Sequence, residues 1–125
     1  MSLKDLLKEQ GIDISRSRAE EILEYHFRIE KLEEGLIKEF EFAKSAGRKF
    51  RADFAYPKLM ILIEVEGVKW NDVTRHTFKS GYENDCRKYN LAAKLGYRVL
   101  RYTGSMIESG EAIQDIKEFM KEHQK

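Results

Sequence analysis

The chain has 125 residues, of which 42% are hydrophobic and 36% charged, and its formal net charge at pH 7 is +1. This composition excludes fibrous, disordered and disulfide-linked classes, because the only cysteine is Cys86, and the length suits a single domain over residues 1–125. No apolar run approaches the roughly 18 residues of a membrane span, and no secretory signal is recognisable, so we expect a cytoplasmic protein with no membrane partner.

The N-terminal part of the chain predicts two helices. A short one is expected at residues 3–9. A longer amphipathic helix is expected from Ser17 to Gly35, because Ser17 and Glu20 have the spacing of a capping box and glycine favours a helix end.

Three strands are expected next, at residues 36–42, 49–56 and 59–66, and short turns between them predict an antiparallel meander. Strict alternation in the second strand places four side chains on one face, namely Phe50, Ala52, Phe54 and Tyr56. The opposite face of that strand would then carry Asp53 and Ala55.

The second half of the chain predicts a loop at 67–79, a helix from Ser80 to about Leu95, a strand at 97–103 and a helix at 109–122. Ser80 and Glu83 suggest a second capping box, and the core stripe of that helix is expected at Tyr82, Cys86, Tyr89 and Ala93. A strand that follows a helix can lie parallel to the strand before it, which gives an α/β fold of order αβββαβα with a mixed sheet.

Carboxylates gather at the end of the third strand, where an apolar run leads into Glu64 and Glu66 on one face. Pairing across the turn makes Asp53 a diagonal neighbour of Glu64, and Glu39 on the first strand could add a fourth acid. Crowded acids at the edge of a core repel one another unless a cation offsets them. The cation that suits oxygen ligands is Mg²⁺, or Mn²⁺ in its place.

A simpler reading of these acids also stands. Glu64 and Glu66 would mark the point where a strand reaches solvent, and Asp53 would pair with Arg51 or Arg98. The charge distribution favours a polyanionic partner, because residues 44–101 hold 13 Lys/Arg and 6 Asp/Glu between acidic flanks.

The stretch FRADFAY, followed by MILIEVEG, resembles the PD-(D/E)XK nuclease superfamily. Residues 48–103 are similar to very-short-patch-repair endonucleases of bacteria and phages, through an ordered series: (W/F)RxDFA, EIEG, RH, D-x-x-K-x-N and G(W/Y)RVLR. The resemblance implies a restriction-endonuclease-like fold and Mg²⁺ bound by Asp53, Glu64 and the Val65 carbonyl, and Glu39 also matches the pattern.

One departure from the superfamily pattern matters for the chemistry, because Glu66 stands where most members have lysine. The charge that this lysine supplies would have to come from elsewhere. The candidates are Lys88, a second metal held by Glu66, or Arg75 and His76 from the loop. His76 could also act as general base or bind phosphate.

The resemblance implies a DNA endonuclease that hydrolyses phosphodiester bonds with metal-activated water, in bacterial or phage DNA repair, recombination or restriction. DNA contacts are expected from Arg48, Lys49, Arg51, Lys69, Trp70, Arg75, His76 and Lys79. One site cuts one strand, so cutting both would require a homodimer. The alternatives are a non-catalytic nucleic-acid-binding module with the same fold, and a structural domain whose acids pair with arginines.

Overall fold

The computed structural model describes residues 14–66 and 75–123. They form two compact units, each presented by itself. The sheet unit takes in Gly35–Glu64 and Val68–Arg101, and the helical unit takes in Met1–Glu34, Val65–Gly67 and Tyr102–Lys125, each within the described range.

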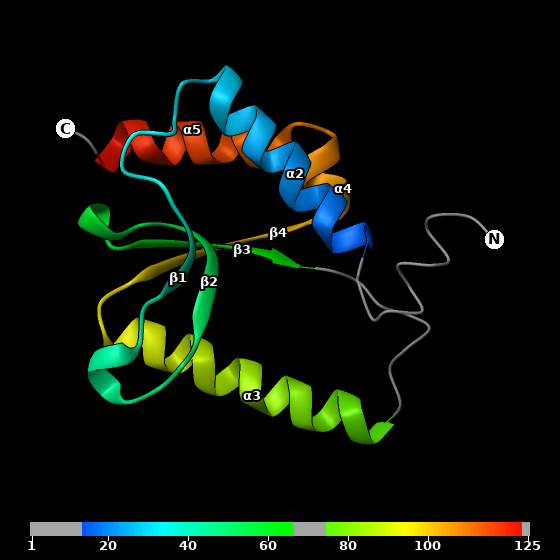
Figure 1. Cartoon of the computed structure of the whole chain (residues 1–125), viewed down its shortest axis with the longest axis vertical. Helices are drawn as coiled ribbons and strands as arrows, with labels where there is room; N and C mark the ends of the chain where they lie inside the picture. Colours follow the sequence, from blue (N-terminus) through cyan, green and yellow to red (C-terminus); the bar gives the residue numbers. More distant parts are fainter. Residues whose placement is uncertain (1–13, 67–74, 124–125) are drawn as a thin grey trace. The chain divides into compact units, whose positions relative to one another are not determined.

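A four-stranded sheet in the order β1-β2-β3-β4 underlies the sheet unit (Figure 1). Its strands are β1 (Ile37–Glu41), β2 (Arg51–Tyr56), β3 (Ile61–Glu66) and β4 (Arg98–Thr103). Strand β1 is antiparallel to β2 and β2 to β3, whereas β4 is parallel to β3. The meander and the mixed α/β sheet expected from alternation and turn residues are therefore confirmed.

The alternation of β2 is less strict than its sequence suggests. Ala52 and Ala55 lie three residues apart, yet both are fully buried in the same hydrophobic cluster. The ladder between β1 and β2 is interrupted at one pair of positions, where Glu39 stands across from Asp53. Glu39 there has a left-handed φ of 48°. Ala55, which pairs with Leu62, lies on the opposite face from Phe54 as predicted, whereas Ala52 joins the same cluster as Ala55 and so departs from the predicted alternation.

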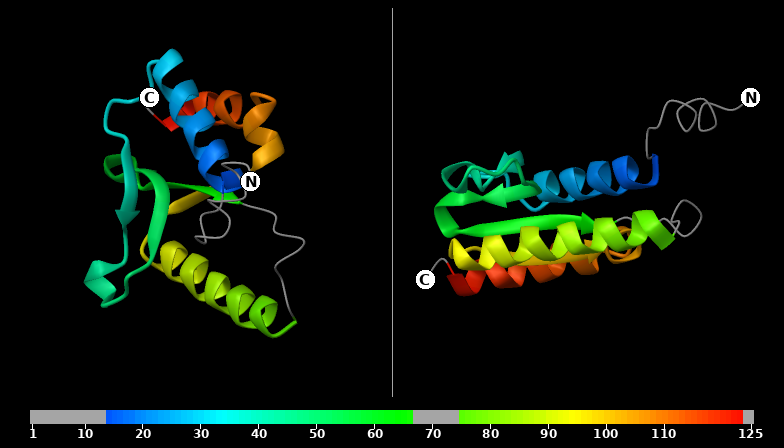
Figure 2. Two further views of the ribbon diagram at one scale, coloured as in Figure 1. Left: turned by 45° about the vertical axis from the view of Figure 1, so that its right-hand side comes forward. Right: turned by 90° about the horizontal axis from the view of Figure 1, so that it is seen from below.

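Helix α3 (Arg75–Lys94) runs alongside the strands of the sheet unit (Figure 2). It begins five residues before the predicted start, so Ser80 lies inside the helix and cannot cap it. Its end is as predicted, because Gly96 has a φ of 93° and the N–H of Tyr97 donates to the Ala92 carbonyl at 2.9 Å.

The predicted core stripe of α3 is wrong at three of its four residues, and the fourth, Tyr89, is half-buried. Tyr82 is 63% exposed, and Cys86 and Ala93 are exposed as well. The helix instead buries Ala92, with Leu91 and Leu95 partly buried beside it. These residues pack with strand residues in one cluster, whose other members are Phe40, Phe42, Ala43, Phe50, Ala52, Ala55, Leu62, Tyr97 and Val99.

Three helices make up the helical unit: α2 (Ile14–Ile29), α4 (Gly104–Glu108) and α5 (Glu111–His123). Helix α2 starts before Ser17, so the predicted capping box is wrong. It also ends before Gly35, because Lys31 adopts a left-handed φ of 57° and the N–H of Leu32 bonds back to the Phe27 carbonyl at 2.8 Å.

The C-terminal helix was expected at 109–122 and is confirmed as α5, but α4 was not predicted. Helix α4 begins after Thr103, whose side-chain oxygen accepts a hydrogen bond from the Met106 N–H at 3.3 Å. This threonine cap was overlooked because five helical residues are too few to show a periodic pattern.

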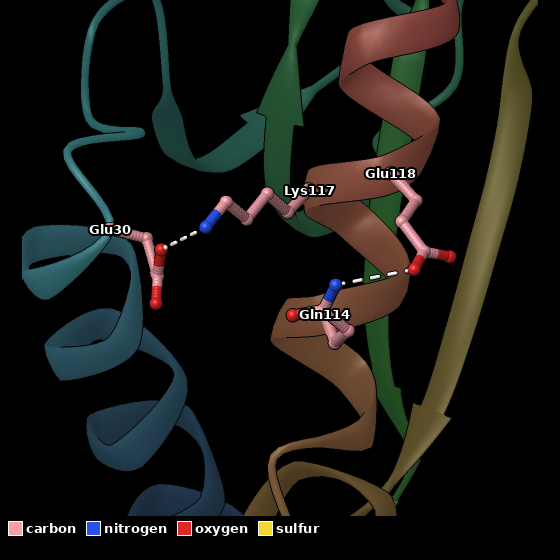
Figure 3. Close-up of polar contacts among 4 residues, drawn as sticks. All are labelled: Glu30, Gln114, Lys117 and Glu118. Carbon is pink, nitrogen blue, oxygen red and sulfur yellow. Dashed lines mark hydrogen bonds and ion pairs between the residues drawn. The ribbon is translucent and has the colours of Figure 1, made fainter.

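Apolar packing and two polar contacts hold the helical unit together. Its fully buried side chains are Leu23, Phe27, Ile107, Ala112 and Ile116. The hydroxyl of Tyr102 donates to Asp115 at 2.7 Å. On α5, Lys117 reaches Glu30 beyond the end of α2 at 2.8 Å, and Gln114 donates to Glu118 at 3.2 Å (Figure 3).

Two structural expectations cannot be compared with the structure. The helix at 3–9 lies outside the described residues, and so does most of the loop at 67–79. Within the described residues, no helix has the length and apolar character to cross a membrane.

Candidate functional site

Asp53 and Glu64 face each other across two neighbouring strands of the sheet unit. The antiparallel register pairs Phe54 with Ile63, and one further step of the same register sets Asp53 opposite Glu64. Directly opposed residues of two strands share a face of the sheet. The expected diagonal relation between the two acids is therefore wrong by one position, because the turn includes a short 3₁₀ helix (Pro57–Leu59) and a left-handed Met60.

Lys88 joins these two acids from helix α3. It lies one helical turn before Ala92, which belongs to the same hydrophobic cluster as Leu62 and Ala55. Leu62 is two residues before Glu64 on β3, so Lys88 and Glu64 extend the same packed layer in the same direction. The Lys88 Nζ atom lies 2.7 Å from Glu64 Oε1, and the two side chains are only 16% and 3% exposed.

Glu64 is a buried carboxyl group whose charged form is stabilised by a nearby positive charge. Burial raises its pKa from the usual 4.5 to about 7, the attraction of Lys88 works against this rise, and the neighbouring Asp53 adds to it. The Lys88 ammonium, 2.7 Å away, is the partner of the buried Oε1 atom of Glu64. This oxygen can still accept a further donor or a cation.

The donor set suits a hard divalent cation held by few protein ligands. Among the residues that the structure describes, no three His, Cys, Asp or Glu side chains form a group that could hold a metal ion. Mg²⁺, however, is commonly bound by one or two carboxylates and keeps several waters. Asp53 and Glu64 are the two carboxylates that would hold such an ion, with Lys88 already beside Glu64.

Glu39 is not gathered into this group, although it was expected as a fourth acid. It stands across from Asp53 in the register of β1 and β2, but its side chain is 70% exposed. It makes an ion pair with Arg51 at 3.9 Å instead. The distortion of β1 at Glu39 explains this, because a left-handed residue does not direct its side chain as a regular strand residue does.

The structure places the other described site residues on both units. Val65 is buried and Glu66 is half-buried at the end of β3, and both belong to the helical unit. Arg48, Lys49 and Arg51 are exposed on the sheet unit. Lys69 and Trp70 lie outside the described residues, and the backbone of α3 includes Arg75, His76 and Lys79, whose side chains are not described.

Two residues that were not predicted as site residues, Tyr89 and Arg101, lie beside this group. The guanidinium carbon of Arg101 sits 4.2 Å above the centre of the Tyr89 ring. Tyr89 follows Lys88 on α3, and the Lys88 Nζ atom is 5.7 Å from the same ring centre. The alternation of β4 could have indicated Arg101, because it is two residues after the core residue Val99.

Comparisons with known proteins identify no relative: no protein-family model, curated protein or solved structure matches the chain. The chemical reading therefore depends on the residues of the site.

Proposed function

We propose that the chain is a metal-dependent DNA endonuclease with a restriction-endonuclease-like fold. One observation carries the proposal: a lysine from a helix lies 2.7 Å from a buried glutamate, and that glutamate stands opposite an aspartate on the neighbouring strand. Asp, Glu and Lys are the three residue types of the PD-(D/E)XK pattern, and the mixed α/β sheet is compatible with the fold of that superfamily.

In the proposed reaction, Asp53 and Glu64 would hold Mg²⁺ or Mn²⁺. A divalent cation at these carboxylates supplies Lewis-acid polarisation of the phosphoryl oxygen and an activated water nucleophile. Glu64 is suited to this role because its burial, at 3% exposure, makes an added positive charge favourable.

Lys88 would stabilise the negative charge that develops on the phosphate. Its ammonium group is already fixed by Glu64 and partly withdrawn from water, and a preorganised charge in such a setting interacts more strongly than one in bulk solvent. Lys88 would therefore replace the strand lysine of the superfamily, whose position is taken by Glu66.

The proposal extends to the setting of the reaction. The substrate would be DNA, met in the cytoplasm of a bacterium or of the host of a phage during repair, recombination or restriction. The products would carry 5′-phosphate and 3′-hydroxyl ends, and cutting both strands would require two copies of the chain.

Cleavage of supercoiled plasmid tests the proposal. The wild-type chain should nick the plasmid with Mg²⁺ or Mn²⁺ and not with chelator. Asp53→Asn and Lys88→Met should each reduce the rate at least about a hundredfold, as the loss of a group that stabilises transition-state charge does. The matched controls are Glu83→Gln and Lys94→Met, which change exposed residues of α3.

A second function is supported by the same ion pair. Because Lys88 already offsets the charge of Glu64, the site could be complete without a metal, as in a nucleic-acid-binding module that has lost catalysis. DNA binding without cleavage under any metal, unchanged by Asp53→Asn, would favour this second function and refute the nuclease.

A further inference from the structure

Apolar side chains lie along the side of helix α2 that faces away from the core of the helical unit. The buried side of this helix is formed by Ala19, Leu23 and Phe27, each at most 3% exposed. Tyr25 lies on the opposite side and is 56% exposed, and Ile29, one turn further along, is 53% exposed. A surface helix ordinarily carries polar residues on its outer side, so these side chains indicate a contact surface.

The residues beside Tyr25 divide into an apolar flank and a charged flank, because a helix turns about 100° per residue. Ile22 and Ile29 lie on one flank of Tyr25, and Ile22 is half-buried. Glu21 and Arg28 lie on the other flank and are both exposed. Neither of these two forms an ion pair with another residue that the structure describes, so the face holds one unpaired anion and one unpaired cation.

The charged flank is complementary to itself when two copies of α2 pack antiparallel about a two-fold axis at Tyr25. In that arrangement a residue before Tyr25 lies beside the residue at an equal distance after Tyr25 in the second copy. Glu21 is four positions before Tyr25 and Arg28 is three positions after it. The two side chains are therefore offset along the helix by only about 1.5 Å, the rise of one residue. The symmetry gives two such Glu21–Arg28 pairs.

The apolar flank obeys the same relation. Ile22 is three positions before Tyr25 and Ile29 is four positions after it, so each Ile22 meets Ile29 of the second copy. The two Tyr25 rings meet on the axis. A parallel arrangement would instead set Glu21 against Glu21 and Arg28 against Arg28, and like charges repel each other. The charges on this face therefore favour the antiparallel packing of two copies.

We propose that two copies of the chain associate through the outer face of α2, packed antiparallel about a two-fold axis at Tyr25. Few side chains take part, so the dimer is weak and forms at high protein concentration. The proposal stands on α2 alone and goes beyond the nuclease, because it holds whether or not the chain cleaves DNA. For a nuclease, the dimer would supply the two sites that cutting both strands requires.

Analytical ultracentrifugation of the full chain tests the proposal over a series of protein concentrations. The wild-type chain should pass from monomer to dimer as its concentration rises. Glu21→Arg turns both attractive pairs into repulsive pairs and should weaken dimerisation about tenfold, and Arg28→Glu should do the same. The double variant, Glu21→Arg with Arg28→Glu, exchanges the two charges and should restore the wild-type dissociation constant.

Variants at the axis and away from the face complete the experiment. Tyr25→Asp places two like charges together on the axis and should abolish the dimer, whereas Tyr25→Phe keeps the ring and should dimerise as wild type. Glu122→Arg makes the same change of net charge as Glu21→Arg at an exposed position of α5, and should leave dimerisation unaltered. Far-UV circular dichroism of each variant establishes that it is folded.

Each outcome has a separate meaning. A wild-type chain that remains monomeric up to millimolar concentration overturns the proposal, and so does a double variant that stays as weak as the single variants. Equal effects of Glu21→Arg and Glu122→Arg would reduce the contribution of Glu21 to general charge and also overturn it. Plasmid cleavage by a chain that never dimerises refutes the dimer and leaves the nuclease standing. Dimerisation without cleavage supports the dimer and counts against the nuclease.

Discussion

The buried carboxyl of Glu64 makes the stability of the fold depend on pH in a specific direction. Its pKa is raised from the usual 4.5 to about 7, so between these values the folded chain holds a proton that the unfolded chain has released. The free energy of unfolding must then fall as pH rises through this window. The contribution is fully present below about pH 4.5 and is lost as pH passes about 7.

The magnitude follows from the difference between the two pKa values. A difference of about 2.5 corresponds to about 3 kcal/mol, because each pKa unit represents about 1.4 kcal/mol. Glu64→Gln keeps the shape of the side chain and removes its charge. The free energy of unfolding of this variant, relative to wild type, should therefore rise by about 3 kcal/mol between about pH 5 and about pH 8.

Lys88→Met should lower the free energy of unfolding where Glu64→Gln raises it, because the attraction of Lys88 limits the rise in the pKa of Glu64. Without it the pKa rises further, and the loss of stability should grow and extend above about pH 7. Lys94→Met changes an exposed lysine of the same helix and should leave the pH dependence unaltered.

The assay is urea unfolding followed by far-UV circular dichroism at a series of pH values, in buffer with chelator. The difference between Glu64→Gln and wild type reports Glu64 together with its coupling to Lys88 and Asp53, since all other titrating groups are common to both chains. A difference that stays constant with pH would refute the reasoning. So would a Glu64→Gln variant that loses stability relative to wild type as pH rises, because the charged carboxylate would then be favourable to the fold.

Two further predictions concern the helical unit and use the same unfolding assay. Tyr102→Phe should reduce the free energy of unfolding by about 1–3 kcal/mol, because it leaves the carboxylate of Asp115 without its 2.7 Å donor. Tyr82→Phe, at a 63% exposed position, should change the free energy of unfolding little, and equal effects of the two substitutions would contradict the prediction. Leu23→Ala should cost about 2–5 kcal/mol, since Leu23 is fully buried, whereas Ile29→Ala at a 53% exposed position of the same helix should stay within about 0.5 kcal/mol.

The strands were predictable because their local signals agree with the final packing. Alternating residues and short turns gave β1, β2 and β3 in order, and the expectation of a strand parallel to β3 is confirmed by β4. The exact register was not predictable, because it depends on the left-handed Met60 at the turn. Glycine is the residue that adopts this conformation without strain, so a methionine gives no indication of it in the sequence.

The face of α3 was predicted wrongly for a physical reason. Periodicity identifies a buried face by its apolar residues, and here the buried face includes Lys88. A lysine can lie in such a stripe when an opposite charge lies beneath it, and that charge comes from Glu64 on a distant part of the sequence. A pattern within the helix alone contains no information about it. The periodic pattern therefore favoured Tyr82, which is exposed, over Ala92, which is buried, as a core residue.

The lysine of this site comes from a helix, whereas the superfamily pattern has it on a strand. The superfamily pattern places its lysine two residues after the glutamate on the same strand, where this chain has Glu66. A side chain two residues along a strand lies about 7 Å away on the same face, within the reach of a lysine from a helix that covers that face. Helix α3 covers the face that carries Glu64, because Ala92 and Leu62 belong to one hydrophobic cluster and Lys88 is one turn before Ala92. The ammonium group then reaches the carboxylate from above the sheet instead of from within it.

A strand lysine is consequently not required for the proposed chemistry, and Lys88→Met should reduce the rate of cleavage more than Glu66→Gln in the same plasmid assay. The reverse order would mean that Glu66 holds a second cation and that Lys88 only neutralises Glu64.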